Sequence, residues 1–113
     1  MSKLKTEGVY TFDCFGEEVV AGFSGREFPR DRWPDFLYEL GLAPEKLVLL
    51  KQIHSTNLVM ASEKQIPAAD CPADGLLTKT PGLVLGIQTA DCVPVFFWDP
   101  EHRAVGLVHA GWK

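Results

Sequence analysis

The chain has 113 residues, of which 46% are hydrophobic, 11% aromatic and 23% charged. This length fits one compact domain with its own core, and the composition excludes a disordered chain. A formal net charge of −4, without clustered Lys and Arg, argues against nucleic acid as a partner. No apolar run is long enough for a membrane span or a signal peptide, and three cysteines are too few and odd in number for a disulfide framework. We therefore expect a cytoplasmic protein that binds neither nucleic acid nor membranes.

In chain order, the residue pattern predicts strands at 9–12 and 19–23 around a turn, then one short helix from Pro34 to Leu42 with Gly41 as its C-cap. A polar surface loop is expected at 63–72, and further strands at 47–53, 58–60, 76–78, 82–87, 93–98 and 104–108. Because strands outnumber helices, we predict an α+β fold with mixed β-sheets and flanking helices. The nearly continuous apolar runs predict sheets that are covered on both faces.

The residues 1–113 are expected to form a single but incomplete domain. The last predicted strand is followed only by His109-Ala110-Gly111-Trp112-Lys113, without a cap, a helix or a polar tail. Such a segment is typical of the middle of a domain, so we expect a truncated protein.

Three potential metal ligands stand at equivalent places, each at or after the end of an apolar segment: His54, Cys92 and His109. One thiolate and two imidazoles leave one position of a tetrahedral zinc ion open, which is typical of a catalytic site. The same set with a weak axial methionine would suit copper, and Met60 is the only internal methionine. The alternative for each residue alone is structural, since a lone cysteine is often a small core residue and a histidine at a strand end is often a surface group.

A predicted hairpin brings two of these ligands together. Asp99-Pro100-Glu101-His102 has the residues of a type I turn, so Trp98 would face Arg103. In that register Cys92 and His109 are direct partners, with Cβ atoms about 4.5–5.5 Å apart. Pro94 cannot donate to a ladder, which requires an edge strand or a bulge at that position.

Other chemistries fit less well. The signatures of zinc nucleobase deaminases, of phosphate-binding loops, of dinucleotide-binding folds and of Gly-x-Ser-x-Gly hydrolases are all absent. A nucleophilic pair with Cys92 as the thiolate and His109 as the base remains open. Cys14 and Cys71 are interpreted as structural residues.

Four short motifs occur in a characteristic order: Gln52-Ile53-His54-Ser55, Ala73-Asp74-Gly75-Leu76, Thr89-Ala90-Asp91-Cys92-Val93-Pro94 and Val108-His109-Ala110-Gly111-Trp112. Together they resemble the YfiH-like laccase-domain family, also called multicopper polyphenol oxidoreductases. The match extends from about Gly22 to the end of the chain and is strongest from Ala73 onward. Members of that family are about twice as long and continue after the last motif, so the resemblance implies that this chain is the N-terminal part of such a domain. The implied fold is two sheets sandwiched between helices, in the order α/β/β/α.

The resemblance also implies a function. Members of the family carry out phosphorolysis of purine nucleosides, often with adenosine deamination and cleavage of methylthioadenosine. They hold one metal ion, usually zinc, with residues that correspond to His54, Cys92 and His109. A purine nucleoside and phosphate are then the implied substrates, and zinc is the implied cofactor, with copper as the alternative.

Several further residues are candidates for catalytic or binding roles. Asp91 lies beside a predicted ligand and would orient it or move a proton, although it also fits a turn. Gln52 would hydrogen-bond purine or ribose, or is a solvated edge residue. Arg26 would bind phosphate, or is a surface charge. Asp74 fits a structural turn equally well, and Trp112 would stack on a base or belong to a core.

Three rival functions remain open. One is a copper-dependent phenol oxidase, another is a cysteine-dependent hydrolase without metal, and the third is a non-catalytic fragment that binds only metal or a partner chain. The sequence does not predict the preferred nucleoside or the oligomeric state.

Overall fold

The structure is a computed structural model that describes residues 2–12, 14–16, 18–53, 55–89 and 93–110. It divides into two compact units, Met1–Glu45 and Lys46–Lys113. The described residues contain parallel and antiparallel strand pairs and one α-helix, so the predicted α+β class with mixed sheets is confirmed. The single-domain organisation stays a prediction.

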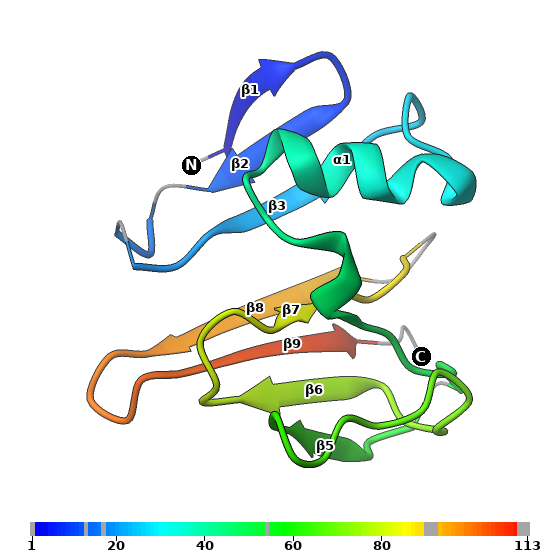
Figure 1. Cartoon of the computed structure of the whole chain (residues 1–113), viewed down its shortest axis with the longest axis vertical. Coiled ribbons are helices and arrows are strands. Elements are labelled where there is room, and N and C mark those ends of the chain that lie inside the picture. Colours follow the sequence, from blue (N-terminus) through cyan, green and yellow to red (C-terminus); the bar gives the residue numbers. More distant parts are fainter. Residues whose placement is uncertain (1, 13, 17, 54, 90–92, 111–113) are drawn as a thin grey trace. The chain divides into compact units, whose positions relative to one another are not determined.

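The first unit contains an antiparallel sheet of three strands in the order β1 (Ser2–Thr6), β2 (Val9–Phe12) and β3 (Ala21–Ser24), which Figure 1 shows in blue. The buried residues Val9, Phe28 and Leu40 form its core cluster. The strand predicted at 19–23 is observed as β3, which begins two residues later and ends at Ser24. β1 was not predicted, because its residues Ser-Lys-Leu-Lys-Thr carry two charges and lack a run of strand-favouring side chains.

The helix of this unit is α1 (Trp33–Glu39), which follows the 3-10 helix η1 (Arg30–Arg32). Pro34 lies in the first turn, where its missing N–H costs nothing. Gly41 ends the helix as predicted, with φ of 77°, and the Leu42 N–H donates to the Leu37 carbonyl at 2.9 Å. The helix stops at Glu39, three residues before the predicted end at Leu42.

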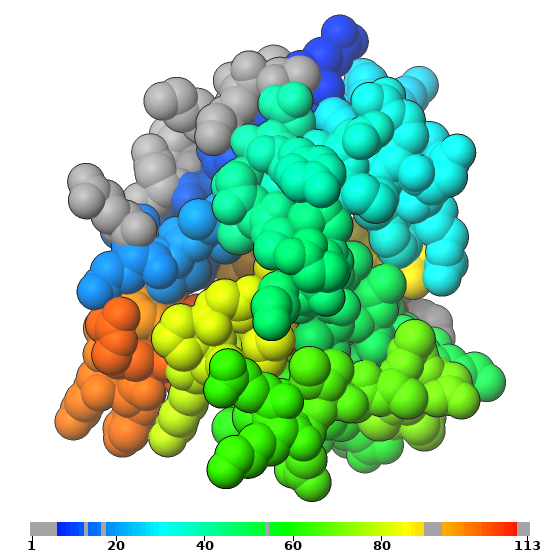
Figure 2. Space-filling view, viewed as in Figure 1, coloured from blue at the N-terminus to red at the C-terminus, as the bar shows by residue number. Residues whose placement is uncertain are grey.

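One side of α1 faces solvent, as the space-filling view shows in cyan to turquoise (Figure 2). Tyr38 is 69% exposed, whereas Leu37 on the other side is 5% exposed. In the part of the chain that the structure describes, no helix is both long and apolar enough to cross a membrane.

The second unit begins with two short parallel strands. After the 3-10 helix η2 (Pro44–Lys46), β4 (Leu47–Val48) pairs with β7 (Val84–Leu85), and the Gly86 N–H extends this pairing to the Val48 carbonyl at 3.0 Å. Both strands are shorter than the predicted strands at 47–53 and 82–87. In the rest of the predicted strand at 49–53, Lys51 forms an isolated bridge with Pro72, and no continuous strand pairing follows.

The larger sheet of this unit has four strands in the order β5 (Leu58–Ala61), β6 (Gly75–Thr78), β9 (Ala104–Ala110) and β8 (Val93–Asp99). β5 runs parallel to β6, while β9 is antiparallel to both of its neighbours; Figure 1 shows the four strands side by side. Pro94 lies in β8 at the edge of the sheet, as its missing donor required.

The two faces of this sheet differ in burial. On one face Ala61 and Leu76 pack with Val48, Leu50 and Ala73 in a buried core. On the other face Leu58, Met60 and Phe97 are 55%, 56% and 51% exposed. The prediction of sheets covered on both faces is therefore wrong here, because an apolar run in the sequence does not reveal whether anything packs on each face.

Candidate functional site

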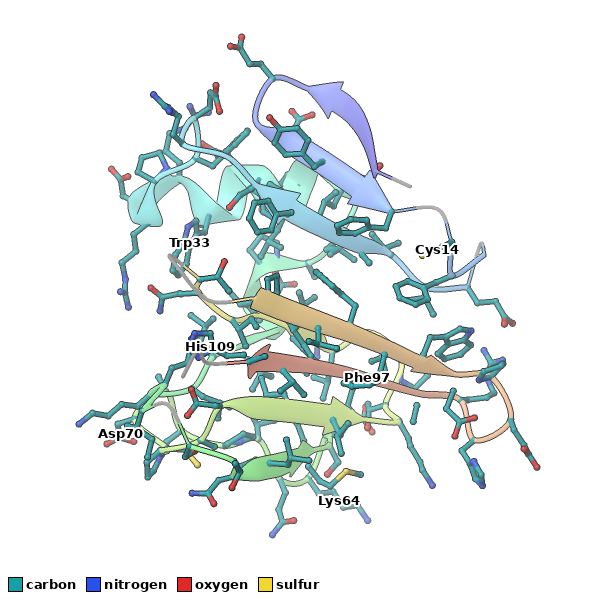
Figure 3. The ribbon with its side chains drawn as sticks, turned by 180° about the vertical axis from the view of Figure 1, so that it is seen from behind. Cys14, Trp33, Lys64, Asp70, Phe97 and His109 are labelled. Atoms are coloured by element: carbon teal, nitrogen blue, oxygen red, sulfur yellow. The ribbon has the colours of Figure 1, made fainter. Side chains whose placement is uncertain are left out.

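One edge of the four-stranded sheet collects several chain segments that are distant in the sequence. β5 and β6 begin there, β9 ends there, and β8 begins there with Pro94 opposite His109. Figure 3 shows His109 at the end of β9 away from the β8–β9 hairpin, with Phe97 nearer to that hairpin. This edge is where chemically active side chains of neighbouring strands can meet.

At this edge Asp74 and His109 form a buried pair. They lie opposite each other because Gly75 pairs with Val108, and the His109 N–H donates to the Asp74 carbonyl at 2.8 Å. Their side chains also meet, with His109 Nδ1 at 2.8 Å from Asp74 Oδ2. Asp74 is 1% exposed and His109 is 6% exposed. Backbone and side-chain bonds together therefore fix the orientation of the imidazole.

The second carboxylate oxygen of Asp74 accepts three hydrogen bonds from the segment before β5. The Ile53 N–H donates to Oδ1 at 3.0 Å, and the Ser55 N–H and hydroxyl donate at 2.9 and 3.0 Å. Asp74 also donates its own N–H to the Asn57 carbonyl at 3.1 Å. One buried carboxylate thus joins the chain around residue 54 to the end of β9.

These contacts determine the charge of the Asp74 carboxyl. Burial acts to raise its pKa, but the hydrogen bonds from His109, Ser55 and Ile53 outweigh burial and hold the pKa well below its ordinary value. Asp74 is therefore an anion that accepts from all of these donors. Perturbed carboxyls of this kind are enriched at functional sites, although structural networks also produce them.

A second link joins the same region to the segment that leads into β8. Gln52 Nε2 donates to the Gln88 carbonyl at 2.6 Å, and Gln52 Oε1 accepts from the Gln88 N–H at 2.7 Å. The side chain of Gln52 thereby pairs with the backbone of Gln88 as a strand neighbour would. The segments around residues 52–55, 74, 88 and 109 are therefore connected by side-chain hydrogen bonds.

The predicted ligands are only partly within the described residues. His109 is described, whereas His54 and Cys92 lie outside, as do Asp91 and Trp112. Within the described ranges, no group of three or more His, Cys, Asp or Glu side chains is arranged to hold a metal ion. The three-ligand site therefore stays a prediction.

The predicted pairing of Cys92 with His109 is wrong, because Pro94 is the partner of His109. The hairpin loop begins one residue later than expected: Asp99 pairs with Ala104, and Arg103 adopts a left-handed conformation with φ of 51°. The Asp99 carboxylate accepts the N–H groups of Glu101 and His102, which stabilises this displaced turn. The register is displaced by two positions, so the residues keep their faces but change their partners.

The remaining candidates belong to other segments of the chain. Arg26 is exposed and belongs to the first unit, so its role in phosphate binding stays a prediction. Met60 lies on the exposed face of the sheet. Its partner is Leu77, and strand alternation puts Leu77 on the face opposite to that of the buried Leu76. Cys71 packs against the core of the second unit, while Cys14 is exposed, and neither forms a disulfide.

Sequence reasoning did not recognise the importance of Asp74. The Asp-Gly pair before a strand fits a turn, and the structure shows instead a buried carboxylate with four side-chain hydrogen bonds. An indication was present, since an ionisable residue two positions before the apolar segment Leu76-Leu77 has to find partners if that strand is buried.

A groove of about 640 Å³ lies along the same sheet, between β5 and β8. Leu58, Leu77, Phe97, Gly106 and Val108 are among its lining residues. Strand alternation puts these side chains on the face opposite to those of Asp74 and His109. Ser55, Asp74 and His109 nevertheless also line the groove, so it reaches the Asp74–His109 pair.

Comparison with known proteins gives a family match. Residues 31–113 match the model of the family described as multi-copper polyphenol oxidoreductase laccase. A purine nucleoside phosphorylase of Bacteroides thetaiotaomicron is 35% identical over 118 aligned residues, covering 96% of this chain and 42% of that protein. The adenosine deaminase RL5 of an unknown prokaryotic organism is 34% identical, covering 66% of this chain and 31% of that protein.

Solved structures agree with this match at the level of the fold. The structure of Bacillus licheniformis hypothetical protein YfiH has a TM-score of 0.84 and 24% identity, covering 98% of this chain and 52% of that chain. YlmD from Geobacillus stearothermophilus has a TM-score of 0.80 and 25% identity, with the same coverage. The chain thus spans about half the length, or less, of these relatives.

Proposed function

Because the chain belongs to the multi-copper polyphenol oxidoreductase laccase family, we propose that it takes part in purine nucleoside phosphorolysis with one zinc ion held by His54, Cys92 and His109. Relatives named purine nucleoside phosphorylase and adenosine deaminase support a nucleoside-processing function. Inosine, adenosine or methylthioadenosine and phosphate are the proposed substrates, and deamination of adenosine is a proposed second activity. The cytoplasm is the proposed compartment.

The observation that carries this proposal is the pair of links between the ligand-bearing segments. Asp74 joins Ile53 and Ser55, which flank His54 in the sequence, to His109. Gln52 joins the same segment to Gln88, four residues before Cys92. Cys92 is also bonded to Val93, the first residue of β8, whose partner is Ala110. These connections support convergence of the three ligands at one edge of the sheet.

The donor set fits zinc. One thiolate and two imidazoles are ligands that zinc prefers, and they leave a fourth position for a substrate or water. Because His109 Nδ1 is hydrogen-bonded to Asp74, Nε2 is the nitrogen that would coordinate the metal. A copper centre with Met60 as axial ligand is disfavoured, since Met60 lies on the opposite face of the sheet and is 56% exposed.

In the proposed mechanism, the protein supplies orientation and charge. Bound zinc would supply a Lewis acid that orients phosphate or lowers the pKa of a water molecule. Asp74 holds the His109 ring in one orientation through its carboxylate. Asp91 would handle a proton beside the ligand Cys92, and Arg26 would bind phosphate through its guanidinium. The Gln52 carboxamide, proposed to bind purine or ribose, already has Gln88 as a partner and would have to share its hydrogen bonds.

One observation favours a second candidate, a cysteine-dependent hydrolase without metal. A histidine base oriented by a carboxylate is the arrangement that activates nucleophilic cysteines, and the Asp74–His109 bond provides it. Cys92 would be the nucleophile in that case. The two candidates differ in their need for metal.

The test is an assay of the 113-residue chain, loaded with zinc, on inosine or adenosine with phosphate. We expect turnover that is lost in Cys92→Ala and retained in Cys14→Ala, a matched control at an exposed cysteine. Turnover and zinc content that are unchanged in Cys92→Ala would contradict the proposal. An inactive chain with full zinc occupancy would contradict the expected turnover of this chain.

A further inference from the structure

We propose that Asp74 is a positioning residue for the metal site. Asp74 sets the tautomer of His109 and holds the residues on both sides of residue 54. This inference rests on the metal site proposed above, because it names the residue that prepares two of its three ligands. In the protein without metal, the tautomer of His109 can be measured separately.

The Asp74 carboxylate determines which nitrogen of the His109 imidazole carries the proton. An ionised carboxylate can only accept hydrogen bonds, so Nδ1 of His109 has to be the donor in the 2.8 Å contact with Asp74 Oδ2. In a neutral imidazole the lone pair is then on Nε2. The ring cannot turn easily, because His109 is 6% exposed and its backbone N–H is bound to the Asp74 carbonyl. The nitrogen that would meet a metal ion is therefore selected before the ion arrives.

The Asp74 carboxylate also holds the segment before β5. The backbone N–H groups of Ile53 and Ser55 both donate to Asp74 Oδ1, at 3.0 and 2.9 Å. The Ser55 hydroxyl adds a third bond at 3.0 Å and accepts the Asn57 N–H at 3.2 Å. Two donors on one acceptor hold Ile53 and Ser55, neither of which is described as part of a strand. His54 stands between those two residues in the sequence.

The arrangement distinguishes a positioning role from a purely structural one. An asparagine in place of Asp74 retains an oxygen that can accept from Ile53 and Ser55. Its amide nitrogen, however, donates and cannot accept from His109 Nδ1. In Asp74→Asn the ring would place its proton on Nε2, the position that a metal ion requires to be unprotonated. The variant therefore changes the tautomer while it preserves most of the local backbone contacts.

The experiment compares wild type, Asp74→Asn and Ser55→Ala. Nitrogen-15 NMR of the metal-free protein reports the tautomer of His109, and competition with a chromophoric chelator reports zinc affinity. We expect the Nδ1–H tautomer in wild type and in Ser55→Ala, and the Nε2–H tautomer in Asp74→Asn. We expect zinc affinity to fall about 10–100-fold in Asp74→Asn, the range for residues that hydrogen-bond to ligating histidines, and far less in Ser55→Ala.

The outcomes separate the two proposals. A wild-type protein that binds no zinc, but whose tautomer changes in Asp74→Asn, would contradict the proposed function and support the positioning role. An unchanged tautomer, or equal zinc affinities where wild type and Asp74→Asn both bind zinc, would overturn the positioning role. If Asp74→Asn does not fold, the wild-type spectrum decides, since an Nε2–H tautomer of His109 would overturn it.

Discussion

The carboxamide of Gln52 and the backbone of Gln88 form a closed pair of hydrogen bonds across 36 positions of sequence, at 2.6 and 2.7 Å. This pair continues the contact between β4 and β7 beyond their last ladder residues, Val48 and Leu85. It also brings together the segments that precede His54 and Cys92. The relationship therefore predicts that Gln52 affects both the stability of the second unit and its metal affinity.

Gln52→Ala removes both hydrogen bonds. Since Gln88 is exposed and water can replace the lost partner, we expect the free energy of unfolding to fall by only about 1 kcal/mol. Zinc affinity should fall as well, because the two ligand-bearing segments lose their link. Denaturant unfolding and chelator competition measure these effects. Gln65→Ala, at an exposed glutamine of the 63–72 loop, is the matched control, and equal results for the two variants would contradict the prediction.

Thr78→Val tests the core without affecting the metal site. Thr78 is 1% exposed, donates to the Ala61 carbonyl at 2.7 Å and accepts the Thr80 N–H at 3.0 Å. Valine has a similar shape but leaves both backbone groups without this partner, so unfolding should become easier by about 1–3 kcal/mol. Thr78→Ser retains the hydroxyl, so its loss of stability should be smaller than that of Thr78→Val. Because Thr78 lies at the opposite end of β6 from Asp74, zinc affinity of the folded variant should not change.

The pH dependence of stability should reveal the Asp74 carboxylate. Its pKa is lower in the folded protein than the ordinary value of about 3.9 expected after unfolding. The stabilisation is therefore complete above that value and is lost as the pH falls below about 4. Asp74→Asn should be less stable than wild type at neutral pH, and the difference should shrink in acid.

Urea unfolding of the metal-free protein at a series of pH values measures this difference. Asp99→Asn is the control: His102 lowers the pKa of the Asp99 carboxyl too, but this pair is exposed and should contribute little. A stability difference between wild type and Asp74→Asn that stays constant from neutral pH to strong acid would contradict the role given to the carboxylate.

Removal of metal distinguishes the two candidate chemistries. If the activity depends on zinc, a strong chelator should abolish turnover of nucleoside, and added zinc should restore it. A cysteine hydrolase would survive the chelator and lose its activity after alkylation of Cys92. One preparation is divided, and its portions are assayed in parallel after treatment with chelator or with alkylating reagent. Full activity after chelation, with verified absence of metal, would favour the hydrolase.

The sequence was informative where local chemistry determines structure. Gly41 ended the helix, Pro94 lay on an edge strand, and the apolar segments at 58–60, 76–78, 93–98 and 104–108 formed the four-stranded sheet. Prediction from the sequence failed where the structure depends on a single backbone angle or on a partner that is distant in the sequence. The left-handed Arg103 displaced the hairpin register, which no turn preference of Asp99-Pro100 reveals.

In the candidate site, too, local features could be predicted and contacts between distant residues could not. The sequence allows His54, Cys92 and His109 to be proposed as ligands from their residue types and places, and of these only His109 lies within the described residues. The role of Asp74 could not be predicted, because its side-chain partners are 19 to 35 residues away and become neighbours only when β5, β6 and β9 align. An aspartate before a glycine looks the same in a surface turn as in a buried network.

The central claim is that His54, Cys92 and His109 bind one zinc ion, and X-ray absorption at the zinc edge tests it most directly. We predict one zinc per chain with one sulfur ligand at about 2.3 Å and two imidazole nitrogens at about 2.0–2.1 Å. The sulfur should disappear in Cys92→Ala and persist in Cys71→Ala. A zinc ion without a sulfur ligand, or a sulfur that persists in Cys92→Ala, would contradict the claim.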